Sequence, residues 1–234
     1  MKREKTSLQD YAFLEIRKRI QNGTYPPGAK LSTQEISDSL GISRTPVVAA
    51  INRLVAQGVA DAIPNRGVTV AKITPRRILE TVDIRMMIER FCVRPAIKNL
   101  DYVPEIVSEM QEVADALQTT EDFNAAYELE SRFHTLFVKL AGNEKLLGIY
   151  ESNWSIGSIF FLWTASSTNM DYLWASLKES KKILELLLAK DAEALEDFIQ
   201  QHIQVVYDTI DWYIRQGMDQ ITMMPKRLDQ MKTM

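Results

Sequence analysis

Apolar residues recur at every third or fourth position along most of the chain, a period that predicts amphipathic helices. One stretch departs from it: between residues 59 and 70 two short apolar runs flank Pro64-Asn65-Arg66-Gly67, which is typical of a β-hairpin. The pattern predicts a small unit of helices and one hairpin, followed by an all-α antiparallel bundle of about six helices. Helices are predicted over about residues 8–22, 32–41 and 43–58 before the hairpin, and over about 75–99, 104–118, 121–141, 144–165, 171–189 and 192–216 after it, with Pro95 expected to kink or break the first of the later set.

The two helices on either side of Gly41 are the most informative pair. Ser32 or Thr33 can cap the first helix, Gly41 ends it, and Ser43 can cap the second. Two short helices joined by a glycine-containing turn make a helix-turn-helix, which lays its second helix in the major groove of DNA. Together with the helix before it and the hairpin after it, the pair predicts a winged helix-turn-helix.

The exposed start of the second helix carries side chains suited to DNA. The guanidinium of Arg44 can pair with a guanine edge or a phosphate, and Ser43 and Thr45 offer hydroxyls to phosphate oxygens. Arg66, beside Gly67 at the hairpin tip, can enter a minor groove. The plainer alternative, a helix cap with one solvated charge, stays open on three residues alone.

Three motifs in fixed order carry a family resemblance. They read I-x-x-G-x-Y-P-P-G-x-x-L from Ile20, G-I-S-R-T-P-V from Gly41 and P-N-R-G-V-x-V from Pro64. This pattern resembles the GntR family of bacterial transcriptional regulators, and a looser resemblance to its FadR subfamily, with a helical effector domain of the FCD type, continues to about residue 215. The resemblance implies that Gln34, Ser43, Arg44, Thr45, Arg66 and Gly67 fall on positions used for DNA contact.

One departure from the family pattern concerns the operator. The family usually continues the second motif with Arg-Glu, and that arginine commonly helps to read DNA, whereas Val48 and Ala49 stand here. We therefore expect DNA binding, while the operator sequence stays open.

Charge is unevenly distributed along the 234 residues, whose net charge is −3. Residues 1–73 hold 11 Lys and Arg against 6 Asp and Glu, and the remainder holds 17 against 25. A basic first part suits DNA, and an acidic second part is repelled by phosphate. With a helix start at Thr74-Pro75, we expect residues 1–73 to bind DNA, 74–217 to bind an effector and dimerise, and 218–234 to form a partly disordered tail.

Composition favours a soluble cytoplasmic protein. Cys92 is the single cysteine, so no intramolecular disulfide can form, and within a helical pattern it reads as a small buried residue. The N-terminus lacks the apolar region of a signal peptide, and the longest strongly apolar run, Ile159 to Trp163, is too short to span a bilayer. We expect no membrane partner.

Polar residues interrupt the apolar stripes of the predicted bundle. Glu130 and His134 lie four apart on the inner face of one helix, and His202 lies on the inner face of the last. Arg85 and Ser180 occupy inner positions of two others. Buried ionisable groups require partners, so these positions indicate a polar site within the bundle.

A carboxylate and two imidazoles are typical ligands of a first-row transition metal such as zinc, nickel or manganese. This set resembles the metal site of the FCD type, whose members commonly bind a metal through an acid four residues before a His and through two further His. By this resemblance the corresponding positions here are Glu130, His134, Ser180 and His202. Ser180 stands where the family has a histidine, so one nitrogen ligand is missing. A site of Glu130, His134 and His202 stands beside two alternatives: satisfied core polar residues, or a metal-free pocket for an organic ligand.

Arg85 can act as a bidentate clamp for a carboxylate effector, or form an internal salt bridge to Glu130 or another acid. Asn153 can add a hydrogen bond to the same ligand. We therefore expect a homodimeric transcriptional regulator, most simply a repressor, that binds double-stranded operator DNA and a small carboxylate held near Arg85, Glu130, His134, Asn153, Ser180 and His202.

Two rival functions remain at this stage. An enzyme could use the same acid and histidines to activate a metal-bound water, although no nucleophile motif, phosphate loop or cofactor fingerprint accompanies them. A DNA-binding protein without an effector is the second rival. We expect no catalytic residues.

Overall fold

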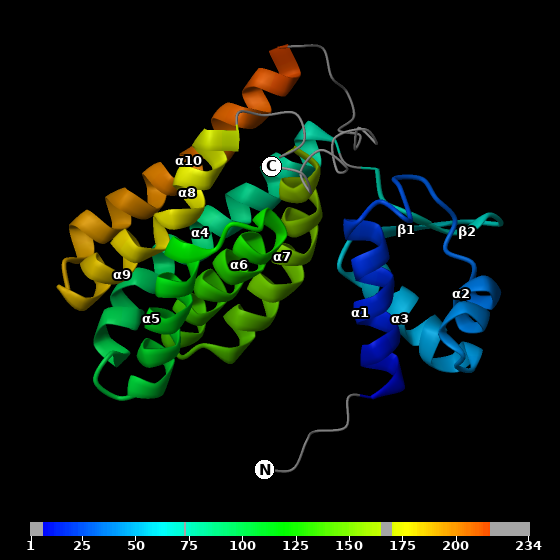
Figure 1. Cartoon of the computed structure of the whole chain (residues 1–234), viewed down its shortest axis with the longest axis horizontal. Helices are drawn as coiled ribbons and strands as arrows, with labels where there is room; N and C mark the ends of the chain where they lie inside the picture. Colours follow the sequence, from blue (N-terminus) through cyan, green and yellow to red (C-terminus); the bar gives the residue numbers. More distant parts are fainter. Residues whose placement is uncertain (1–6, 73, 165–169, 216–234) are drawn as a thin grey trace. The chain divides into compact units, whose positions relative to one another are not determined.

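The computed structural model describes residues 7–72, 74–164 and 170–215, so the predicted tail at 218–234 lies outside the described residues. The chain divides into two compact units, one reaching residue 73 and one beginning at Thr74. The first unit contains α1 (Leu8–Gln21), α2 (Thr33–Leu40), α3 (Arg44–Ala56), β1 (Ala60–Ile63) and β2 (Gly67–Val70) (Figure 1).

Local sequence explains how α2 and α3 begin and end. The hydroxyl of Ser32 accepts a hydrogen bond from the backbone N–H of Glu35 at 3.3 Å, and Gly41 ends α2 in a left-handed conformation with φ of 66°. Ser43 is the N-cap residue of α3, but its side chain makes no capping hydrogen bond. Ser43 therefore occupies the predicted N-cap position, but the capping hydrogen bond is absent and the residue is exposed.

The hairpin is antiparallel, with Ala60 paired to Val70 and Ile63 paired to Gly67. Its turn has Asn65 at φ of 61° and Gly67 at φ of 89°, a conformation that these two residue types tolerate best. A preceding segment extends the sheet, because the N–H of Leu31 donates to the carbonyl of Val68 at 2.9 Å. Apolar side chains of α1 and α3 form the core beneath: Ala12, Phe13, Ile16, Ile20, Val47, Ala50, Ile51 and Leu54 are all buried.

The second unit is all-helical. It contains α4 (Pro75–Asn99), α5 (Pro104–Thr119), α6 (Phe123–Leu140), α7 (Glu144–Thr164), α8 (Met170–Lys178), α9 (Ser180–Leu188) and α10 (Ala192–Arg215). Helix α4 packs against α6, α7 and α10, and α5 packs against α6 and α9 (Figure 1). Cys92 is fully buried in α4, as expected of a small core residue.

Two details of this unit differ from the sequence prediction. Helix α4 is not broken at Pro95, because the loss of one helical hydrogen bond is outweighed by packing against neighbouring helices. The segment predicted as one helix at 171–189 is two helices, α8 and α9, separated at Glu179. Among the described residues, no helix is long and apolar enough to cross a membrane.

Candidate functional site

Charged side chains from three helices meet inside the helical unit. Helix α4 contributes Arg85 and Glu89, α6 contributes Glu130 and His134, and α10 contributes His202. Each of these five residues is at most 6% exposed. They are called the buried cluster below. Because a buried charge is stable only when it is paired, their mutual contacts determine what the cluster can bind.

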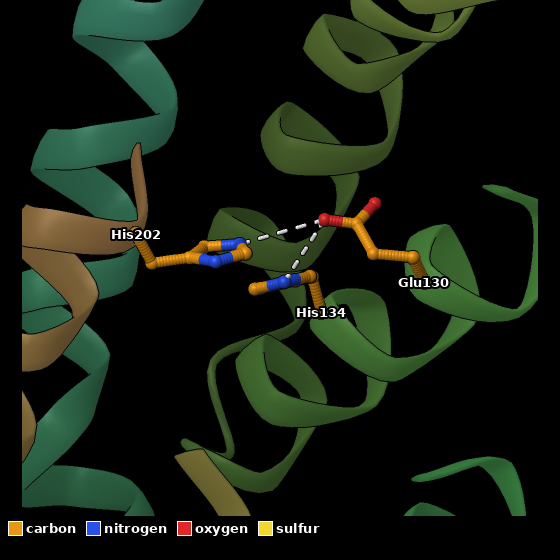
Figure 2. A group of neighbouring side chains, drawn as sticks. All are labelled: Glu130, His134 and His202. Atoms are coloured by element: carbon orange, nitrogen blue, oxygen red, sulfur yellow. Dashed lines mark ion pairs between the residues drawn. The ribbon is translucent and has the colours of Figure 1, made fainter. Parts of the chain in front are cut away.

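Both imidazoles face one oxygen of Glu130 (Figure 2). The Nε2 atom of His134 lies 3.2 Å from Oε1 of Glu130, and the Nε2 atom of His202 lies 3.6 Å from the same oxygen. The first contact follows from the four-residue spacing on α6, and the second brings in a helix from the far end of the chain. The ligand atoms of these three residues all lie within 4.8 Å of one another, close enough to share one metal ion.

A carboxylate holds the opposite nitrogen of each imidazole. Nδ1 of His134 lies 2.9 Å from Oε2 of Glu89, and Nδ1 of His202 lies 2.8 Å from Oε2 of Glu179. A carboxylate at Nδ1 favours the tautomer with the proton on Nδ1, so that Nε2 carries the lone pair that can bind a ligand. Metal-binding histidines in proteins almost always have such a partner on the second nitrogen.

Arg85 is the cation of the buried cluster. Its Nε donates to Oε1 of Glu89 at 2.7 Å, and its Nη2 donates to Oε1 of Glu130 at 3.2 Å. The same Nη2 lies 3.2 Å from Nε2 of His202, and the guanidinium stacks over Trp154 at 4.3 Å. The internal salt bridge to Glu130, which was one of the two interpretations of Arg85 from the sequence, is therefore present.

The protonation states follow from these contacts. Burial raises the pKa of the Glu89 carboxyl, but the charges of Arg85 and His134 outweigh burial and lower this pKa to about 2. Burial also opposes ionisation of Glu130, yet His134 and Arg85 hold its pKa well below the usual value. Burial lowers the pKa of His134, and the two carboxylates more than compensate, so that this pKa is raised. Two carboxylates thus face one guanidinium, which leaves one unbalanced negative charge unless an imidazole is protonated.

The residues present fit a divalent metal. Among the described residues, Oε2 of Glu130 and Nε2 of His134 have no hydrogen-bond partner although both atoms are buried, so two candidate ligand atoms are unsatisfied. The net negative charge of the two carboxylates and Arg85, and the orientation of the two Nε2 atoms, also favour binding of a divalent metal ion. Arg85 opposes this fit, because its Nη2 contacts two of the three ligand residues.

Two further predicted effector residues, Asn153 and Ser180, make no direct contact with the buried cluster among the described interactions. Asn153 of α7 donates from Nδ2 to the backbone carbonyl of Thr81 at 2.9 Å, so its amide links α7 to α4. Ser180 is fully buried at the start of α9, and its hydroxyl lies 3.5 Å from the carbonyl of Leu177.

Three functional neighbours did not emerge from the sequence. Glu89 follows Arg85 by four residues, a spacing on one helical face that could have revealed the pair. The apolar pattern does not distinguish Tyr150, whose hydroxyl donates to Oε1 of Glu89 at 2.6 Å. Glu179 lies at the break between α8 and α9, which no local pattern indicated.

The predicted DNA-contacting residues are all exposed, and they lie on α2, at the start of α3 and at the hairpin turn. Ser43, Arg44 and Thr45 are exposed at the N-terminal end of α3, and Arg66 and Gly67 are exposed at the hairpin turn. Arg44 and Arg66 make no ion pair among the described side chains, whereas Arg53 pairs with Asp10. Gln34 on α2 donates to the carboxylate of Asp38 at 2.7 and 2.8 Å.

A winged helix-turn-helix followed by a helical domain with a buried polar cluster defines a DNA-binding transcriptional regulator. Residues 8–70 match the family of bacterial regulatory proteins called gntR, and residues 80–205 match the FCD domain. The chain therefore belongs to the GntR family and carries an FCD domain.

Relatives of known name agree with this class. The HTH-type transcriptional regulator McbR of Escherichia coli (strain K12) is 29% identical over 208 residues, which span 82% of this chain and 90% of McbR. The HTH-type transcriptional repressor RspR of the same strain is 25% identical over 211 residues, spanning 85% and 90%. The solved structure of E. coli McbR/YncC superposes with a TM-score of 0.72 at 25% identity, covering 86% of this chain and 98% of that one.

Proposed function

We propose that this chain is a homodimeric repressor whose helical domain binds a small carboxylate effector together with a divalent transition metal. Glu130, His134 and His202 are the proposed metal ligands. The observation that carries the proposal is the pair of carboxylates, Glu89 and Glu179, that hold both imidazoles by Nδ1. Satisfied core polar residues do not need this arrangement, whereas metal-binding histidines do.

Charge explains why a metal and a carboxylate belong together. Without a metal, Arg85, Glu89 and Glu130 sum to one negative charge, and a proton on His134 would at most cancel it, so the buried cluster has no net positive charge to attract an anion. A bound divalent ion reverses this balance to one positive charge and leaves coordination positions open, which suits a monocarboxylate.

Arg85 has a proposed role in effector binding. Its Nη2 now contacts Glu130 and His202. When those two residues turn to a metal, the guanidinium is released from them and becomes available for an effector carboxylate. Asn153 and Ser180 are proposed to complete the effector site, through the amide that now holds Thr81 and the buried hydroxyl.

Regulation follows from linkage between the two domains. Paired half-sites on operator DNA suit a dimer with two-fold symmetry, because each winged helix alone offers a small interface. An effector that changes the packing of the helical domain changes the spacing of the two recognition helices, and an operator must weaken the effector by the same factor.

The partner surface in the dimer is proposed to include an apolar face of α4. Met87 and Phe91 lie one turn apart there and are 66% and 62% exposed. A second copy of the chain would remove both from water.

The proposal is tested by fluorescence anisotropy with a labelled operator duplex obtained by selection. Zinc, nickel or manganese is added together with a panel of small carboxylates, and the expected result is release of the duplex that requires both components. The variant His134→Ala should not respond, while Gln204→Ala, an exposed position of the same helix as His202, should respond normally. An effector that tightens DNA binding, or acts equally well on His134→Ala, contradicts the proposal.

A further inference from the structure

The outer face of α3 carries one large apolar side chain. Val48 is 42% exposed, whereas the inward residues Val47, Ala50 and Ile51 are fully or almost fully buried. Exposed neighbours on the same face are Arg44, four residues before Val48, and Asn52, four residues after it. The core of the unit therefore does not require Val48.

The position of Val48 determines what it can meet. In a helix-turn-helix, the N-terminal residues of the second helix contact base edges in the major groove. Val48 is the fifth residue of α3, and it lies about 6 Å along the helix from Arg44. That distance corresponds to roughly two base pairs of DNA.

The chemistry of valine narrows the contact to one group. A valine side chain neither donates nor accepts a hydrogen bond, so it cannot pair with the N7, O6 or N6 groups of purines. The only apolar group that a base exposes in the major groove is the 5-methyl of thymine. A β-branched residue also loses rotamer freedom in a helix, so it offers a preformed apolar surface.

We propose that Val48 reads a thymine methyl group in each operator half-site, within about two base pairs of the base contacted by Arg44. The inference rests on DNA binding by the first unit and adds the base that one residue specifies. Thr45, which is also exposed on α3 and also carries a methyl group, is the competing reader.

The test begins with in vitro selection of duplexes by the full-length chain. In the selected duplex, each thymine is then replaced in turn by deoxyuridine, which removes only the methyl group. One thymine per half-site should lose about fourfold in affinity on replacement, the value of one buried methyl group, and the loss should multiply when both half-sites are changed.

Two variants assign the methyl contact to one residue. In Val48→Ala, thymine and deoxyuridine duplexes should bind almost equally, because the partner of the methyl group is gone. Thr45→Ser keeps the hydroxyl and removes the competing methyl group, and it should retain the wild-type difference. The inference is overturned when no thymine recurs in the selected half-sites, when deoxyuridine binds as well as thymine, or when Thr45→Ser rather than Val48→Ala abolishes the difference. Failure to select any duplex would instead contradict DNA binding itself.

Discussion

His134 and His202 stack inside the helical domain, with ring centroids 5.0 Å apart and an interplanar angle of 19°. They come from α6 and α10, and their Nε2 atoms both face Oε1 of Glu130. Two imidazoles so close together repel each other when both are protonated. A metal bound at their Nε2 atoms would keep both neutral and would satisfy Nε2 of His134, which makes no hydrogen bond within the part of the chain that the structure describes.

The carboxylates behind the imidazoles should determine metal affinity. Glu89→Gln and Glu179→Gln keep the size of each side chain but weaken the hold on Nδ1, so each should lower zinc affinity by about 10-fold to 100-fold. Isothermal titration calorimetry on the metal-free protein measures this change. The control is Glu185→Gln, an exposed glutamate of α9, which should bind zinc normally. Equal affinities in all three variants would mean that the two carboxylates do not support a metal site.

Arg85 should matter more to stability than any surface arginine. Arg85→Met leaves Glu89 and Glu130 buried without their cation, which should reduce the free energy of unfolding by about 3–5 kcal/mol. Urea denaturation of the metal-free protein gives this value, and added zinc should restore part of it. Arg132→Met removes an exposed pair with Glu109 and should cost about 1 kcal/mol or less. A loss as small as that of Arg132→Met would show that Arg85 is not the balancing charge of the buried cluster.

Arg44 should carry a large share of DNA affinity. It is exposed on α3 and has no ion pair among the described residues. Arg44→Ala should weaken operator binding by about 1–3 kcal/mol, and measurements at several salt concentrations separate a base contact from a phosphate contact. A phosphate contact lowers the salt slope by about one, whereas a guanine contact relaxes specificity at one position. Arg76→Ala, at an exposed position of α4, serves as the control and should change neither quantity.

The apolar face of α4 should govern the oligomeric state. Phe91→Glu places a charge in the proposed interface, so sedimentation equilibrium should show a shift from dimer to monomer and weaker operator binding. Tyr102→Glu changes another exposed aromatic residue, 78% exposed beyond the end of α4, and should leave the dimer intact. A dimer that survives Phe91→Glu would place the interface elsewhere.

The sequence predicted local features well and the contacts between distant elements less well. Glu130 and His134 were identified because their four-residue spacing puts both on one face of a helix, and the inward stripe of α10 identified His202. Glu179 was missed, since the periodicity of apolar residues runs through the break between α8 and α9 that positions it. The partner of Tyr150 depends on how α7 packs against α4, a long-range property that no local pattern contains.

In the first unit too, local features were predicted from the sequence and a contact between distant segments was not. Glycines and caps defined the bounds of α2 and α3, because turn conformation is a local property. The added pairing of Leu31 with Val68 joins a loop to the hairpin across more than thirty residues, and no local pattern predicts a contact over that separation.

The proposed metal site is tested by elemental analysis of the full-length protein, purified without an affinity tag or added metal. We expect about one equivalent of zinc, nickel or manganese per chain, lost in His134→Ala and retained in Gln204→Ala. Protein that contains no metal, and binds none when titrated with these three ions, would contradict it. The buried cluster would then be a salt-bridged core centred on Arg85.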